Sequence, residues 1–148
     1  MTLQGLYEYA EENGIEIYTE MKLHNKKAFA IEEVSGERAV VLDRSKIETR
    51  CEEKAILSEE LGHLHCDALC YVRDYSNPLR AQNIRRAEYK ALSWAYLTLL
   101  PYRELKAVVV KEKDLYRVAE HFDVPFSFLQ NAILFYQKIG IASCRERV

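Results

Sequence analysis

The sequence contains little of several features that would place it in a specialised class. Its four cysteines in 148 residues are too few for a secreted disulfide scaffold. No stretch approaches the roughly 18 uninterrupted apolar residues that a membrane span needs. The 21 Lys and Arg residues nearly balance the 23 Asp and Glu residues, and the net charge of -2 argues against a dedicated nucleic-acid-binding domain. Residues 1–14 lack the basic-then-apolar pattern of a signal peptide, so we expect a cytoplasmic protein.

The length and composition describe one ordinary globular domain. A chain of 148 residues with 49% hydrophobic and 30% charged residues lies within the usual range for a single domain. A domain of this size buries about two-thirds of its unfolded surface, so it needs no metal or disulfide in order to fold. We therefore predict a single domain over residues 1–148, with a core over 1–110 and a C-terminal helical pair over 111–148.

The pattern of apolar residues changes from mixed to helical along the chain. An opening helix over residues 3–14 ends at Asn13-Gly14, and short β-type runs separated by turn signals follow it. Beyond these runs the spacing is helical, which predicts an α+β fold with a small antiparallel sheet packed on a long helix. The expected strands are 15–17, 28–31 and 39–42, and the later helices are 46–71, 84–100, 113–122 and 125–137.

One segment in the middle of the predicted helix over 46–71 carries residues that suit metal chemistry. Glu59 and His63 are four residues apart and project from the same helix face. Glu60 lies beside them, in the place of the general base in the His-Glu-x-x-His helix of metalloproteases. Glu59 stands where that motif has its first His. A carboxylate binds zinc at nearly the same distance as an imidazole, but its negative charge makes the ion a weaker Lewis acid.

The pattern Glu-Glu-x-x-His alone is weak evidence, because such residues are common on a solvated helix face. Gly62 adds a second signal. A glycine in mid-helix costs about 1 kcal/mol relative to alanine, which indicates that another part of the chain approaches the helix closely at this position.

Several segments resemble the ImmA/IrrE family of metallo-endopeptidases, which phages and other mobile elements carry and which also occur as stress regulators. The resemblance covers roughly residues 5–137 in the correct order, and its centre is Ile56-Leu-Ser-Glu-Glu-Leu-Gly-His63. The flanking matches are Ala39-Val-Val-Leu-Asp-Arg-Ser-Lys-Ile47 before it, then Tyr75-Ser-Asn-Pro78, residues 84–95, Leu99-Leu-Pro101, and Val118 to Pro125 with Phe128.

This resemblance implies a zincin-like fold and zinc-dependent cleavage of a protein partner. It implies that Glu59, His63 and Glu88 hold the metal, and that Glu60 is the catalytic base. The partner that it implies is a helix-turn-helix transcriptional repressor of a phage or mobile element. Most members have His at the position of Glu59. Three outcomes therefore stay open: Glu59 ligates the metal, His63 and Glu88 bind it weakly, or the protein is a metal-free relative.

A second metal cluster can be drawn on the same helix. Glu59, His63, Cys66 and Cys70 form one stripe, but His63 and Cys70 would lie about 10 Å apart along a straight helix. That separation is too large for one tetrahedral zinc. We interpret both cysteines as small core residues, and we expect His65 to face away from the site.

Residues 114–137 resemble a helix-turn-helix. The second helix of this pair, from Phe126 to Gln137, contains no Lys or Arg, whereas a recognition helix needs basic and amide side chains to contact phosphates and bases. We therefore expect no direct nucleic-acid binding, and the pair either packs on the catalytic helices or forms a protein-docking surface. The rival functions are a catalytically inactive protein that binds the repressor or another regulatory partner, and a phage or toxin–antitoxin regulator with a structural metal.

Overall fold

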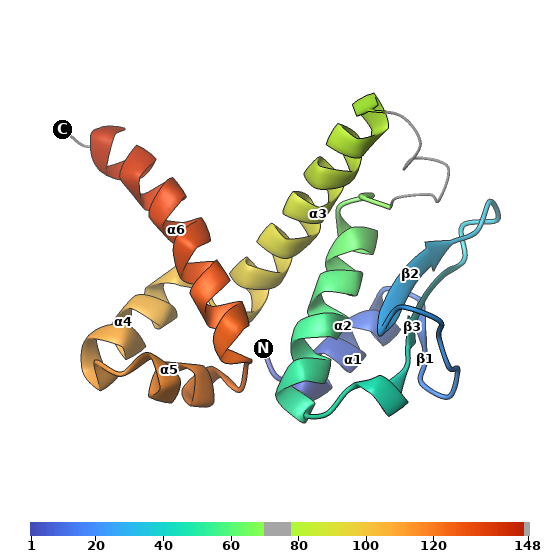
Figure 1. Cartoon of the computed structure of the whole chain (residues 1–148), viewed down its shortest axis with the longest axis horizontal. Helices are drawn as coiled ribbons and strands as arrows, with labels where there is room; N and C mark the ends of the chain where they lie inside the picture. The colour runs from blue at the N-terminus through green and yellow to red at the C-terminus, as the bar shows by residue number, and fades with distance from the viewer. Residues whose placement is uncertain (70–77, 147–148) are drawn as a thin grey trace.

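The computed structural model describes residues 1–69 and 78–146, and it confirms the α+β class. Helices α2 and α3 lie side by side at the centre, with the sheet on one side and α4, α5 and α6 on the other (Figure 1). The elements in chain order are α1 (Leu3–Glu12), β1 (Ile15–Tyr18), β2 (Ala28–Glu32), β3 (Arg38–Leu42), the 3-10 helix η1 (Arg44–Lys46), α2 (Arg50–His65), α3 (Pro78–Leu99), α4 (Tyr102–Glu112), α5 (Leu115–Phe122) and α6 (Phe126–Glu146).

The three strands form one sheet in the order β1-β3-β2. β2 pairs antiparallel with β3, as predicted, but β1 pairs parallel with β3, so the expectation of an entirely antiparallel sheet is wrong for this pair. The loop over residues 19–27 is long enough to leave a gap of one strand between β1 and β2. β3 fills this gap and pairs with both strands. β2 is consequently an edge strand, and it packs beside α2.

Helix α2 is shorter at its start than predicted. The side chain of Thr49 accepts a hydrogen bond from the Glu52 backbone N–H at 3.1 Å, and Glu52 Oε2 accepts one from the Glu48 N–H at 2.9 Å. These bonds satisfy free N–H groups at a helix N-terminus, so α2 begins at Arg50 and not at residue 46. It ends at His65, so the prediction of helix over residues 66–69 is wrong as well; residues 70 and 71 of the predicted helix lie outside the described residues.

The C-terminal half contains one helix more than predicted. Pro101 ends α3, as expected, but the chain then forms α4 until Lys113, which adopts a left-handed conformation with φ 59°. The β-branched run Val108-Val-Val110 gives α4 a weak helix propensity, and only Leu105 among its described side chains is fully buried. The predicted pair of helices over 113–122 and 125–137 corresponds to α5 and α6, and α6 extends beyond residue 137 to Glu146. α4 is an additional helix that precedes this pair.

The apolar core lies between α2 and its neighbours. Leu57, Leu61 and Leu64 of α2 are fully buried and belong to one cluster with residues of α1, the sheet and the C-terminal helices. The buried Lys54 donates a hydrogen bond to the Phe122 carbonyl at 2.5 Å, which joins α2 to the C-terminus of α5. No helix in the described part of the chain is both long and apolar enough to cross a membrane.

Candidate metal centre

The candidate centre depends on a close contact between α2 and α3. Gly62 is buried, and a Cβ atom built on it would lie 2.5 Å from the Ala91 carbonyl oxygen. That distance is shorter than any tolerable contact, so only glycine allows the two helices to approach this closely. The close approach that the mid-helix glycine predicted is confirmed, and its partner is the backbone of α3.

This contact brings three potential ligands together. One ligand atom each from Glu59, His63 and Glu88 can be chosen so that all lie within 4.8 Å of one another, and no other such group occurs among the described residues. His63 Nε2 lies 3.5 Å from Glu88 Oε1. Glu59 and His63 come from successive turns of α2, whereas Glu88 comes from the first half of α3.

A backbone group fixes the orientation of the His63 ring. Nδ1–H donates a hydrogen bond to the Ala68 carbonyl oxygen at 2.7 Å, and the ring is nearly buried, with 8% of the residue exposed. The proton on Nδ1 leaves the lone pair of neutral His63 on Nε2, the atom that faces Glu88. Metal-binding histidines are commonly oriented by this kind of second hydrogen bond.

The acidic and basic groups of the cluster shift one another's pKa values. Burial, together with the negative charges of Glu60 and Glu88, raises the pKa of Glu59 to about 7. Burial lowers the pKa of His63, but its bonds to Glu88 and the Ala68 carbonyl outweigh this and raise it to about 9. The hydrogen bond from His63 holds the pKa of Glu88 below its ordinary value. In the metal-free protein, the protons on Glu59 and His63 therefore reduce the repulsion among these carboxyl groups, as a bound cation would.

The donor set fits zinc. Catalytic zinc sites use three protein ligands of the His N and carboxylate O type and leave one position open. Glu59, His63 and Glu88 provide one imidazole and two carboxylates. Ligands at about 2.0–2.2 Å from an ion lie closer together than 4.8 Å, so a small inward movement of flexible glutamate side chains completes the set. Glu88 is only half-buried, which allows this movement.

Glu60 lies between the cluster and the edge strand β2. Burial raises the pKa of its carboxyl group, while the charges of His63 and Lys26 and a hydrogen bond from the Ala30 backbone N–H lower it. A partly buried carboxylate with a raised pKa suits a general base. Ala30 belongs to β2, an edge strand of the sheet, so Glu60 lies near that edge.

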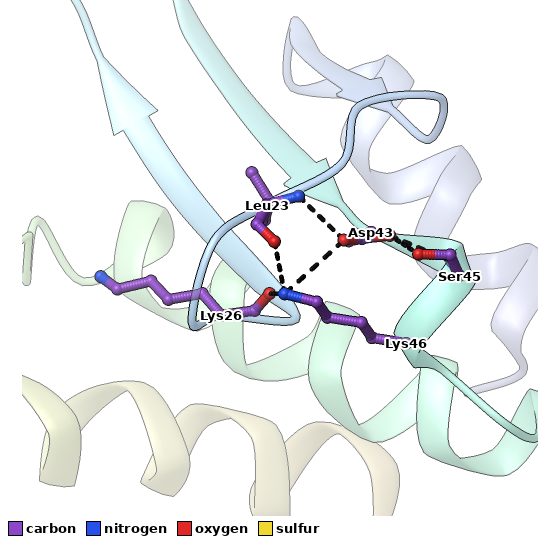
Figure 2. A network of polar contacts seen from close by, with 5 residues as sticks. All are labelled: Leu23, Lys26, Asp43, Ser45 and Lys46. Carbon is purple, nitrogen blue, oxygen red and sulfur yellow. Dashed lines mark hydrogen bonds and ion pairs between the residues drawn. The ribbon is translucent and has the colours of Figure 1, made fainter.

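The loop that carries Lys26 is anchored by a buried carboxylate. Asp43 accepts hydrogen bonds from Leu23 N–H at 2.8 Å and from the Ser45 hydroxyl at 2.5 Å, and these bonds lower its pKa. Lys46 donates to the carbonyls of Leu23 and Lys26. Figure 2 shows this network, with the Lys26 side chain extending away from it. The loop before β2 therefore holds a fixed backbone that places the Lys26 charge near Glu60 and Glu88.

Residues 10–134 match the sequence profile of Peptidase_M78, described as the IrrE N-terminal-like domain. The chain belongs to this family. The match includes α2, α3 and all four residues discussed above, and the family name indicates a metallopeptidase-like function. No significant match was found to a curated protein or to a solved structure.

Within this IrrE-like domain, the two other candidate ligands that the structure describes, His65 and Cys66, do not join the cluster. His65 faces away, as predicted: its Nδ1 lies 2.6 Å from the Tyr9 hydroxyl, and its ring packs on Trp94 with centroids 5.2 Å apart. Cys66 is partly buried, and its Sγ lies 3.7 Å from the Lys90 carbonyl oxygen on α3. Cys70 lies outside the described residues.

Three groups around the centre have no signal in the sequence. The Ala68 carbonyl and the Ala30 N–H are backbone groups, which any residue would provide, and Lys26 is one of several lysines in an irregular loop. No spacing rule connects them with α2. Only the packing of the loop, the edge strand and the end of α2 brings them to the site.

Proposed function

We propose that this protein is a zinc-dependent endopeptidase that cleaves a protein partner. The observation that carries the proposal is the group of Glu59, His63 and Glu88 with ligand atoms within 4.8 Å, together with the partly buried Glu60 beside it. Membership of the IrrE N-terminal-like family supports a metallopeptidase of this kind.

In this proposal each residue has a separate role. Glu59, His63 and Glu88 hold the ion, and the Ala68 carbonyl keeps His63 in the tautomer that presents Nε2. A bound zinc ion supplies Lewis-acid polarisation of a peptide carbonyl and makes water easier to deprotonate. Glu60 accepts a proton from the attacking water and then donates it to the amine that leaves. Lys26 offsets part of the negative charge around Glu60 and Glu88.

The proposed partner is a helix-turn-helix transcriptional repressor of a phage or mobile element. This part of the proposal rests on the resemblance of the α2 motif and its flanking segments to the ImmA/IrrE family. The C-terminal helices do not act as a DNA reader in this proposal, because the described surface of α6 up to residue 137 offers amides and aromatic rings but no cation.

The second candidate function is binding of the same partner without cleavage. The observation in its favour is Glu59, which replaces the usual neutral ligand with a carboxylate whose pKa is about 7. This change adds negative charge to the ion's ligands and weakens its action as a Lewis acid. It leaves the fold and the surface around the site intact.

The deciding experiment combines metal analysis with a variant of the proposed base. We expect close to one zinc ion per chain after purification, and cleavage of the co-expressed repressor by the native protein. Glu60→Gln should keep the zinc and lose cleavage by at least about a hundredfold, whereas Glu11→Gln, an exposed change on α1, should retain both. A metal-free protein that binds the repressor with native affinity and leaves it uncut would establish the second candidate instead.

A further inference from the structure

A groove leads away from the candidate metal centre along α2. Its volume is about 590 Å³, and Glu59 lines one end of it. The floor follows α2 back toward its N-terminus, and the opposite wall is the turn between α5 and α6. A volume of this size is within the range of ligand-binding pockets in proteins.

The groove is apolar next to Glu59 and charged only at its far end. Ala55 and Ile56 lie one helical turn before Glu59, and Pro125 and Phe128 face them from the other wall. At the far end, Lys27 forms an ion pair with Glu52.

At that far end Lys27 and Glu52 neutralise each other, and the exposed Glu48 adds one further carboxylate. Glu52 also accepts the Glu48 N–H at 2.9 Å, so its carboxylate is fully engaged by the protein itself. Apart from Glu59 itself, which the proposed function assigns to the metal, no charged residue lines this part of the groove. It does offer the carbon surfaces of an isoleucine, an alanine, a proline and a phenylalanine, from which an apolar group can exclude water.

The wall made by the C-terminal helices is held firmly in place. Phe128 packs edge-on against Tyr96 of α3, with ring centroids 5.0 Å apart. Tyr136 of α6 donates a hydrogen bond to the Leu100 carbonyl at 2.7 Å, and Lys54 of α2 donates to Phe122 at the end of α5. These contacts fix the α5–α6 turn relative to both ligand-bearing helices.

We propose that this groove is the specificity subsite of the enzyme and binds one large apolar side chain of the substrate, Leu, Ile, Met or Phe. The side chain would occupy a fixed position beside the scissile bond, because Glu59 is both a wall of the groove and a member of the ligand group. The turn between α5 and α6 then selects the substrate peptide. This inference rests on the proposed function.

The test fills the groove from its exposed wall. Ser127 lines the groove and is exposed, whereas Gln130 is exposed one turn later on α6 and does not line it. Ser127→Phe should narrow the groove, and Gln130→Phe is the matched control. Each protein is given a positional-scanning decapeptide library, and cut sites are read by mass spectrometry. Bound peptides are read separately in the Glu60→Gln background, and zinc content is measured for every variant.

We expect the native protein to require a large apolar residue at one position beside the cut bond. Ser127→Phe should lower kcat/KM for such peptides by about ten- to a hundredfold, with zinc content unchanged, while Gln130→Phe stays native. A second variant, Ile56→Ala, enlarges the groove and should shift the preference from Leu toward Phe and Trp. Cleavage without an apolar preference, or equal activity of the two phenylalanine variants, would contradict the proposed subsite. Neither result would contradict the proposed peptidase function.

If the native protein cuts no peptide, the proposed peptidase function is wrong. The proposed subsite is then tested by the binding measurement alone. Enrichment of apolar residues among the peptides bound by Glu60→Gln, lost on adding Ser127→Phe, would support the groove as a binding site. Absence of that enrichment, or enrichment of Lys and Arg, would overturn it.

Discussion

At the scale of single residues, Glu59 has the largest consequence for the chemistry. A histidine at this position would bring a neutral ligand, whereas the glutamate adds a third carboxyl group to a site that already contains Glu60 and Glu88. Burial, and after it the charges of Glu60 and Glu88, raises the pKa of Glu59. A cation relieves this repulsion, which is the physical reason that three carboxylates around one imidazole favour a metal.

The raised pKa values predict how zinc binding depends on pH. Glu59 and His63 have pKa values of about 7 and about 9 in the metal-free protein, so each carries a proton below its pKa that zinc must displace. Zinc affinity should therefore rise with pH, by about tenfold per unit between pH 7 and 9 and more steeply below pH 7. Isothermal titration or a competing chelator over this range measures the slope.

The variant Glu59→Gln distinguishes the proton that zinc displaces from Glu59 from the one that it displaces from His63, in the same titration. The variant should bind zinc about ten- to a hundredfold more weakly at pH 8, and the steeper region below pH 7 should be lost because the amide does not titrate. Glu11→Gln again provides the unchanged control. Native affinity in Glu59→Gln would show that the carboxylate is not a ligand.

At the scale of secondary-structure elements, the contact between α2 and α3 at Gly62 positions the three candidate ligands. Most elements were predicted correctly, because amphipathic spacing and end signals such as Asn13-Gly14 and Pro101 are local. The exceptions were α4, whose valine run has weak helix propensity and whose side chains are mostly exposed, and the parallel pairing of β1. Strand order depends on which neighbours a strand finds in space, and no local pattern encodes it.

Gly62→Ala tests this contact, with Gly140→Ala as its control. A Cβ at residue 62 would meet the α3 backbone, whereas one at residue 140 of α6 has nothing within 4 Å. Gly140→Ala should therefore stabilise the protein by up to about 1 kcal/mol through helix propensity. Gly62→Ala should destabilise it by about 1–3 kcal/mol through overpacking and weaken zinc binding by moving His63 from Glu88. Chemical unfolding provides the comparison, and a stabilised Gly62→Ala variant would contradict the close contact.

At the scale of the whole molecule, the C-terminal helices are joined to the ligand-bearing helices by buried polar bonds as well as by apolar packing. Lys54 is 4% exposed, and its amine donates to the last carbonyl of α5. Burial lowers the pKa of this amine, because removing its positive charge from water costs free energy. The bond satisfies a carbonyl at a helix C-terminus that would otherwise lack a partner.

Lys54→Met should loosen the C-terminal helices selectively. The change leaves the Phe122 carbonyl without its donor, and we expect a loss of about 1 kcal/mol in the free energy of unfolding. Amide hydrogen exchange should increase in α5 and at the start of α6, with little change in the sheet. Lys138→Met, an exposed change on α6, should alter neither measurement. Faster exchange spread evenly over the chain would show that Lys54 does not act on these helices in particular.

The sequence by itself determined which residues of α2 share a face and that something approaches Gly62, because helical spacing and the conformational cost of glycine are local properties. Glu88 could be named only through a family resemblance, since 25 residues separate it from His63. The tertiary structure alone decided that the Ala68 carbonyl orients His63, that Lys26 and Ala30 act on Glu60, and that the α5–α6 turn forms a groove beside Glu59. These relations depend on how the helices, the loop and the sheet pack together, and contacts across the core follow no periodic pattern in the sequence.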